Sequence, residues 1–133
     1  MVNIVNTLNL NVTHALNNED NYFNIKKYTF NNNEYRIIRY AKDKLKTIDV
    51  NNNFETFSEI SKYRSVIIRN NKVVCFAPEK SLDYSYFVSK NNAENSWLED
   101  FVDGTMINVF YDTIKETWEI STCSTVGGNI VFF

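Results

Sequence analysis

The chain has 133 residues, of which 44% are hydrophobic and 15% aromatic. This provides enough apolar surface for one domain with a modest core and too little for two, so we expect residues 1–133 to form a single domain. The formal charge of −2 argues against nucleic-acid binding over the whole surface, but it leaves room for a local basic groove.

Cysteine and histidine usage argues against a metal site. Cys75 and Cys123 lie far apart without a CxxC spacing, and His14 is the only histidine. We expect reduced thiols at two small, buried cysteines and no zinc site. No run of residues is long enough to cross a bilayer, and residues 1–13 lack the pattern of a signal peptide. The sequence therefore predicts an intracellular, cytoplasmic protein with no membrane partner.

The first periodic pattern lies near the N-terminus. Apolar residues recur there at spacings near three and four, at Val5, Leu8, Val12, Ala15 and Leu16. This spacing predicts an amphipathic helix that ends around residues 17–18, with His14 as a surface or cap residue rather than a catalytic base. A strand over residues 8–12 is an alternative that the sequence leaves open.

Two hairpins are expected in the middle of the chain. Residues 25–30 and 35–40 alternate in polarity and flank an asparagine triplet. Residues 63–69 and 72–77 do the same around Asn70-Asn71, and asparagine pairs of this kind are typical of turns. The sequence therefore predicts at least four antiparallel strands before residue 78.

The segments around these hairpins carry weaker signals. Phe54, Phe57 and Ile60 predict a short helix or turn before the second hairpin. The lone Pro78 ends the last strand of that hairpin. Residues 81–96 are rich in Asn and Ser, and we expect them to be less regular.

A third hairpin is expected in the last third of the chain. Residues 103–111 and 118–122 alternate as paired strands do, with Asp103-Gly104 at the mouth of the hairpin. Gly127-Gly128 follows, with no lysine after it, so it fails the test for a phosphate-binding loop. We interpret that glycine pair as a turn or bulge between strands.

Aromatic side chains recur along these predicted strands. The candidates for stacking on nucleic-acid bases are Trp97, Trp118, Tyr63, Phe76, Phe110 and Tyr111. Because aromatics that alternate along strands are more often buried, we interpret them as core residues. Together the elements predict an α+β fold, with an N-terminal helix followed by a twisted, mainly antiparallel sheet.

An ordered series of short blocks resembles the phage-type RNA ligases, which are covalent nucleotidyltransferases. Residues 35–40 are similar to an early strand of that family, residues 63–67 to its Arg-Gly-Ile/Val strand, and residues 73–81 to the next strand with its lysine. Residues 101–107 resemble the Lys-x-Asp-Gly-Ser-Leu-Ile element, and residues 121–125 the Thr-Arg/Lys-Gly-Ser element. The resemblance implies a truncated version of the adenylyltransferase domain of RNA and DNA ligases.

The resemblance also implies a chemistry and a set of site residues. In that family a lysine attacks the α-phosphate of ATP and forms lysyl-AMP, with a divalent metal stabilising the developing charge. ATP and Mg²⁺ are thus the implied cofactors, and RNA is the implied partner. The implied location is the cytoplasm, including the cytoplasm of a virus-infected cell. The implied nucleotide-binding residues are Arg64, Lys80, Asp103 and Gly104, with Glu119 as a carboxylate facing the same groove.

The chain departs from the family at the positions that carry the chemistry. Phe101 stands where the nucleophilic lysine belongs, and Cys123 stands where an Arg or Lys is expected. Lys80 is a poor substitute nucleophile because Glu79 would favour its protonated form. The downstream motifs of the family are missing, and the apolar residues 130–133 resemble a strand cut short, which suggests pairing with a second chain.

The leading functional expectation is an RNA-ligase-like nucleotidyltransferase homologue, degenerate or fragmentary, that binds a nucleotide or RNA rather than catalysing strand joining. A capping-type guanylyltransferase needs the same lysine and fails for the same reason. The alternative, from another class, is a non-catalytic scaffold or protein-interaction module that kept the sheet and lost the site.

Overall fold

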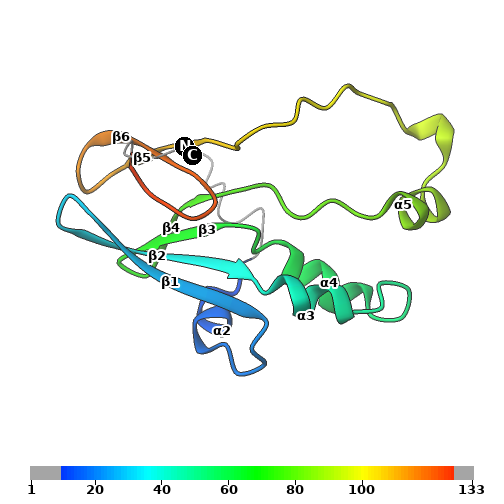
Figure 1. The fold of residues 1–133 in the computed structure, drawn as a ribbon, viewed down its shortest axis with the longest axis horizontal. Helices are drawn as coiled ribbons and strands as arrows, with labels where there is room; N and C mark the ends of the chain where they lie inside the picture. The colour runs from blue at the N-terminus through cyan, green and yellow to red at the C-terminus, as the bar shows by residue number, and fades with distance from the viewer. Residues whose placement is uncertain (1–9, 128–133) are drawn as a thin grey trace.

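The fold is built around a four-stranded antiparallel sheet, in a computed structural model that describes residues 10–127 (Figure 1). The strands pair in chain order, and they are β1 (Phe23–Phe30), β2 (Asn33–Tyr40), β3 (Val66–Arg69) and β4 (Lys72–Phe76). Helices accompany the sheet, so the predicted α+β class and antiparallel pairing are confirmed.

Two asparagine pairs set the register of this sheet. Asn31 and Asn32 join β1 to β2, and Asn70 and Asn71 join β3 to β4, all with φ between 48° and 61°. Asparagine tolerates this left-handed conformation better than most residues, and a two-residue turn of this hand matches the twist of a hairpin. Both predicted hairpins are confirmed, although residues 63–65 precede β3 rather than belonging to it.

Helices cover one face of the sheet. They are α2 (Val12–Asn17), α3 (Lys42–Thr47) and α4 (Phe54–Ser61). Their buried side chains pack with those of β1, β2 and β3 in one core cluster that includes Ala15, Leu45, Phe57 and Ile38. The N-terminal helix expected to end around residues 17–18 is confirmed over residues 12–17, and the short helix or turn expected at Phe54, Phe57 and Ile60 is the helix α4. The helix α3 was not predicted, because only Leu45 of its six residues is buried.

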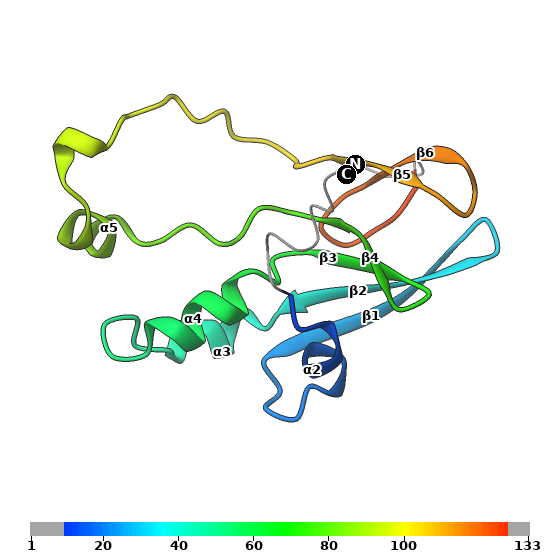
Figure 2. The same ribbon diagram turned by 180° about the vertical axis from the view of Figure 1, so that it is seen from behind.

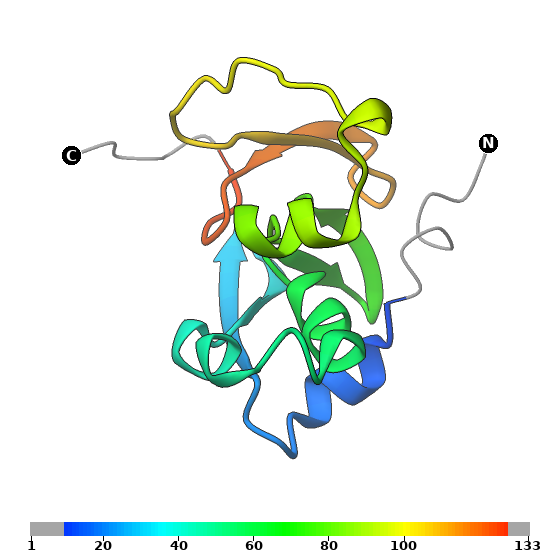
Figure 3. The same ribbon diagram turned by 90° about the vertical axis from the view of Figure 1, so that its right-hand side faces the viewer.

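A hairpin covers the other face of the sheet (Figure 3). It consists of β5 (Asn108–Asp112) and β6 (Thr117–Ser121), and its Phe110 packs with Tyr35, Ile37 and Ile67 of the main sheet. This third predicted hairpin is confirmed, but residues 103–107 are not part of it. Because both faces of the sheet are covered, all four residues of β3 are buried.

A buried polar network ties the hairpin to the sheet. Asp112 of β5 accepts a hydrogen bond from the Tyr35 hydroxyl at 2.8 Å and pairs with the Arg69 guanidinium. Its other carboxylate oxygen accepts from the backbone N–H groups of Ile114 and Lys115 at 3.0 and 3.2 Å. Every oxygen of this buried carboxylate therefore has a partner, as burial of a charge requires.

The segment between β4 and β5 leaves the body of the molecule and returns to it (Figures 1 and 2). It contains α5 (Tyr84–Lys90) and a 3₁₀ turn, η1 (Ala93–Asn95). The expectation of an irregular segment over residues 81–96 is thus wrong. The side chain of Asp83 caps α5 by accepting from the N–H of Ser85 at 2.9 Å, and none of the residues of α5 is buried.

Some expectations fall outside the described residues, namely those for Val5, Leu8, Gly128 and residues 130–133. Between residues 10 and 127, no helix has the length and apolar character that a membrane crossing needs. Gly127 has a φ of 96° and follows a bridge between Ser121 and Val126, as expected of a turn or bulge. His14 is exposed on α2, as predicted.

Candidate functional site

The largest cavity lies where β2, α3 and the two ends of the segment between β4 and β5 meet, and we call it the cleft. Its volume is about 670 Å³. The residues that line it are Arg39, Tyr40, Lys42, Leu45, Lys46, Arg64, Ala77, Lys80, Ser81, Gly104, Thr105, Met106 and Cys123. Three predicted site residues, Arg64, Lys80 and Gly104, are therefore brought together, although they are far apart in the sequence.

Backbone hydrogen bonds place the two predicted cations of the cleft. Tyr63 accepts from the N–H of Tyr40 at 2.7 Å, which fixes the chain beside Arg64 against the end of β2. The N–H of Ala77 donates to Ser65 at 2.8 Å, and the N–H of Lys80 donates to Ser61 at 3.1 Å. The backbone on each side of the cleft is thus held by the rigid sheet and α4, while the charged side chains stay exposed.

The cleft is strongly basic in a protein of net negative charge. Arg39, Lys42, Lys46, Arg64 and Lys80 line it, and its lining contains no carboxylate. Among residues 10–127 none of these cations forms an ion pair, whereas Arg36, Lys62, Arg69 and Lys115 do so elsewhere. Clustered cations without counter-charges create a positive potential that attracts anions.

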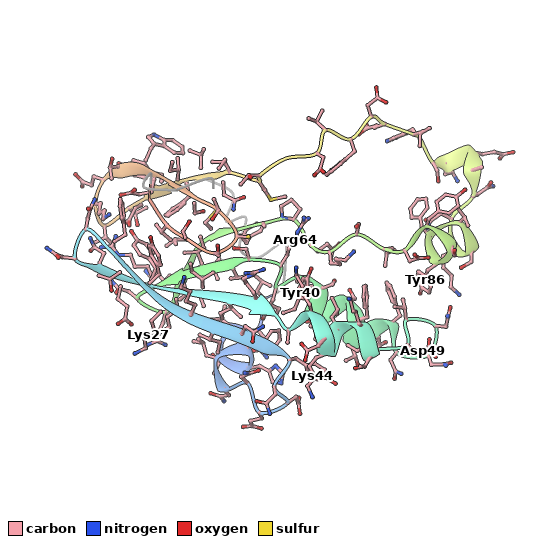
Figure 4. All side chains as sticks on the ribbon, viewed as in Figure 1. Lys27, Tyr40, Lys44, Asp49, Arg64 and Tyr86 are labelled. Atoms are coloured by element: carbon pink, nitrogen blue, oxygen red, sulfur yellow. The ribbon has the colours of Figure 1, made fainter. Side chains whose placement is uncertain are left out.

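Local geometry determines which lysines of α3 line the cleft, and Figure 4 labels Lys44 together with Tyr40 and Arg64 of the cleft lining. Lys42 and Lys46 are four residues apart on the helix, so both project from one side. Lys44 lies between them in the sequence but does not line the cleft. Lys44 therefore has the same charge and a similar exposure without access to the site.

The cleft also has apolar and uncharged polar walls. Leu45 and Ala77 are buried beneath it, and Tyr40 and Met106 are half-buried at its sides. Ser81 and Thr105 add hydroxyl groups. A cleft with cations and an apolar floor suits a ligand that joins an anionic group to an apolar or planar one.

The Asp-Gly dipeptide is divided by the structure. Gly104 lines the cleft, but Asp103 does not, and its side chain accepts only from the N–H of Gly104 at 2.9 Å. A Cβ placed on Gly104 would meet no atom within 4 Å. The dipeptide lies in an extended segment before β5, not at the mouth of the hairpin as predicted.

Three other residues singled out in the sequence lie elsewhere or in an unexpected setting. Phe101 is 89% exposed and does not line the cleft. Glu119 pairs with Lys115 at 2.8 Å, and neither Glu119 nor Asp103 lines the cleft. Cys123 does line the cleft, at the place expected for a cation, but it is exposed rather than buried.

The other cysteine and the aromatic residues give a mixed result. Cys75 is buried, and desolvation raises the pKa of its thiol, so it is an unreactive core residue. Tyr63 and Phe110 are buried as expected, and desolvation raises the pKa of Tyr63 to about 12. Trp97, Trp118 and Tyr111 are 87%, 68% and 45% exposed, so their assignment to the core is wrong.

The implied cofactors fit the cleft unequally. Phosphates of ATP find cations there, but Mg²⁺ needs carboxylate or carbonyl ligands, and the cleft lining offers no carboxylate. No group of three His, Cys, Asp or Glu side chains able to hold a metal exists within the described part of the chain. The residues of the cleft therefore do not fit a carboxylate-bound Mg²⁺.

Arg39, Lys42 and Lys46 line the cleft but were not predicted as site residues. The i and i+4 spacing of the two lysines was an available signal, but α3 itself was not predicted. Comparison with models of protein families, with characterised proteins and with solved structures found no match. The functional argument therefore depends on the geometry and charge of the cleft.

Proposed function

We propose that the cleft binds the phosphate groups of a nucleotide or of an RNA strand and that the protein acts as a binding module. The observation that carries this proposal is the convergence of cations without counter-charges on one cavity, with no carboxylate in its lining. Phosphate-binding sites are built in this way because phosphate oxygens accept charge-assisted hydrogen bonds from Arg and Lys.

Different residues of the cleft have different roles in binding. Arg39 and Arg64 offer planar guanidinium groups that can hold two phosphate oxygens at once, and the lysines contribute mobile point charges. Tyr40 and Met106 give an apolar wall for a ribose or base. The resemblance to RNA ligases implies an ancestor that joined strands with ATP. In this proposal, that ancestor is only the origin of the binding site.

We expect no self-adenylylation. Phe101 has no nucleophilic atom, and it lies outside the cleft lining, so a lysine introduced there would not face bound phosphate. Incubation with radiolabelled ATP and Mg²⁺, followed by a denaturing gel, should leave both the wild type and Phe101→Lys unlabelled. Label on the wild type would identify an unexpected nucleophile, with Lys80 the first candidate, and would contradict the non-catalytic role.

The binding itself is tested with fluorescently labelled ATP and a short single-stranded RNA. Arg64→Ala and Lys80→Ala should each weaken binding by about 1.5–3 kcal/mol if they hold phosphate directly. Lys44→Ala is the matched control and should leave the affinity unchanged, because Lys44 does not line the cleft. Equal losses in all three variants, or no binding by the wild type, would overturn the proposal.

A protein-interaction role is the second candidate, and one observation favours it. Several large apolar side chains between α5 and β5 are almost completely exposed, including Trp97 and Leu98. Contiguous exposed apolar groups of this kind mark interaction surfaces in soluble proteins. None of these exposed apolar groups lines the cleft, although Gly104, which lines it, follows them closely in the chain.

A further inference from the structure

The segment before Gly104 has an unusual surface, and we call residues 97–103 the strap. Four of its seven residues are large and apolar, and their exposed fractions are 87% for Trp97, 100% for Leu98, 89% for Phe101 and 91% for Val102. No described backbone–backbone hydrogen bond involves residues 97–103. The strap therefore presents both apolar side chains and free backbone groups to a partner.

The strap is also acidic. Glu99, Asp100 and Asp103 alternate with its apolar residues, and no lysine or arginine occurs between Lys90 and Lys115. A surface of this charge repels phosphate backbones, which argues against RNA as its partner. The partner that it fits has an apolar groove bordered by cations.

The same molecule carries such a groove. The cleft has five cations around its border and the apolar side chains of Leu45, Ala77, Tyr40 and Met106 in its walls. Charge complementarity and apolar content therefore match between the strap and the cleft. We propose that the strap of one molecule binds in the cleft of a second copy of this chain.

The strap is anchored at both ends, which favours a second copy over the molecule's own cleft. At its C-terminal end, Gly104, Thr105 and Met106 already form part of the wall of the cleft. At its N-terminal end, the strap follows α5, whose Tyr86 stacks on Phe54 of α4 with ring centroids 5.6 Å apart. With both ends held in this way, the strap stands outside its own cleft, and its apolar side chains are exposed there.

Reciprocal exchange gives a closed assembly. The C-terminal end of the strap joins the wall of its own cleft. Two molecules related by a two-fold axis can therefore each place a strap in the other's cleft. Such an arrangement is self-complementary and ends at a dimer, unlike a head-to-tail chain. Partner side chains, with Trp97 and Phe101 as the aromatic anchors, would then complete the apolar wall of each site.

This inference does not depend on the proposed phosphate ligand, although the two share the cleft. It requires only that the cations bind the carboxylates of the strap. Phosphate ligands and a second copy would then compete for one site, so ATP or RNA should dissociate the dimer. If phosphate binding fails while self-association still depends on Arg64, this inference survives and the proposed function does not.

Sedimentation velocity of the full chain over a range of concentrations, without nucleotide, provides the test. The wild type should form a dimer, and the double variant Trp97→Ser/Phe101→Ser should weaken it by at least about tenfold, because anchors of this type dominate interfaces. Trp118→Ser is the matched control, since Trp118 is also exposed but belongs to the β5–β6 hairpin. A wild type that stays monomeric, or a dimer equally weakened by the control, would overturn the proposal.

A mixing experiment tests the pairing of strap with cleft. The strap variant Trp97→Ser/Phe101→Ser and the cleft variant Arg64→Ala/Lys80→Ala should each fail to self-associate. Mixed together they should form a heterodimer, because one intact strap can still bind one intact cleft. No association in the mixture would show that strap and cleft do not bind each other across molecules, and would contradict the proposal.

Discussion

At the scale of single residues, Asp112 is the most consequential side chain of the fold. It belongs to β5 but takes hydrogen bonds from Tyr35 of β2 and pairs with Arg69 of β3. The paired side chains are both less than 10% exposed. Removing either partner would leave a buried charge without compensation, whereas the surface pairs of this protein matter little.

Replacing Asp112 with alanine should therefore destabilise the protein strongly. We expect the free energy of unfolding to fall by about 3–5 kcal/mol, the range for breaking a buried pair from one side. Lys62→Ala, which removes the exposed pair with Glu59, should cost less than about 1 kcal/mol. Urea denaturation of both variants measures the difference, and similar values for the two would contradict this account of the network.

The same carboxylate predicts a pH dependence of stability. Burial raises the pKa of Asp112, but hydrogen bonds from Tyr35, Ile114, Lys115 and Arg69 outweigh burial and hold that pKa below its usual range. The group therefore stabilises the fold fully above its unfolded-state pKa of about 3.9, and this contribution is lost as the pH falls through the lower folded-state value.

Urea unfolding of the wild type should thus show stability falling below about pH 4. In Asp112→Asn the folded and unfolded states no longer differ at this position, so that part of the acid dependence should disappear. If stability in Asp112→Asn still fell with pH between about pH 3 and pH 5 as steeply as in the wild type, Asp112 would not be the group responsible.

Two site residues were predicted through the resemblance to RNA ligases. Arg64 and Lys80 come from the blocks that carry that resemblance, and both line the cleft. Lys42 and Lys46 were missed because the short helix that carries them buries a single residue and so shows no apolar periodicity. The pairing of Glu119 with Lys115 could not be predicted, because the sequence does not determine the register of β5 with β6.

At the scale of elements, the hairpins were predicted because their signals are local. Each of the first two has an asparagine pair between alternating runs, and a two-residue turn determines the register of its flanking strands. The register shift in the pairing of β3 with β4, between Ile67 and Ile68, was not predicted, because no glycine or other local signal marks it in the sequence.

Changes within one turn test this explanation. Asn71 has a φ of 59°, a conformation that glycine adopts freely and β-branched residues avoid. Asn71→Gly should preserve or slightly raise stability, by up to about 0.5 kcal/mol, because Asn-Gly is the favoured pair in such turns. Asn71→Val should lower it by about 1–2 kcal/mol. Thermal unfolding compares them, and equal midpoints would contradict the assigned turn.

The helix α5 was not predicted, although its sequence carries signals for a helix. Tyr84, Phe87 and Val88 have the i, i+3, i+4 spacing of an apolar helix face, yet none of the three is buried. Its cap at Asp83 was a readable signal in the sequence. The position of α5 beside α4 depends on the stack of Tyr86 on Phe54, which no local pattern reveals.

At the scale of the whole molecule, charge is separated in a way that the net value conceals. The chain has a formal charge of −2, yet five of its fourteen cations line one cleft. All the charged side chains of the strap beside that cleft are carboxylates. Composition alone argued weakly against nucleic-acid binding, and it did so because the opposite charges cancel in the sum. Only the folded arrangement shows that the basic residues converge.

The central claim is that the cleft binds phosphate through its cations, and the salt dependence of RNA binding tests it most directly. The logarithm of the association constant for a short single-stranded RNA should fall linearly with the logarithm of salt concentration, by about 0.7 for each phosphate neutralised. In Arg64→Ala this slope should become shallower by about 0.7, while in Lys44→Ala it should equal that of the wild type. An unchanged slope in Arg64→Ala, or a wild-type affinity independent of salt, would contradict the account.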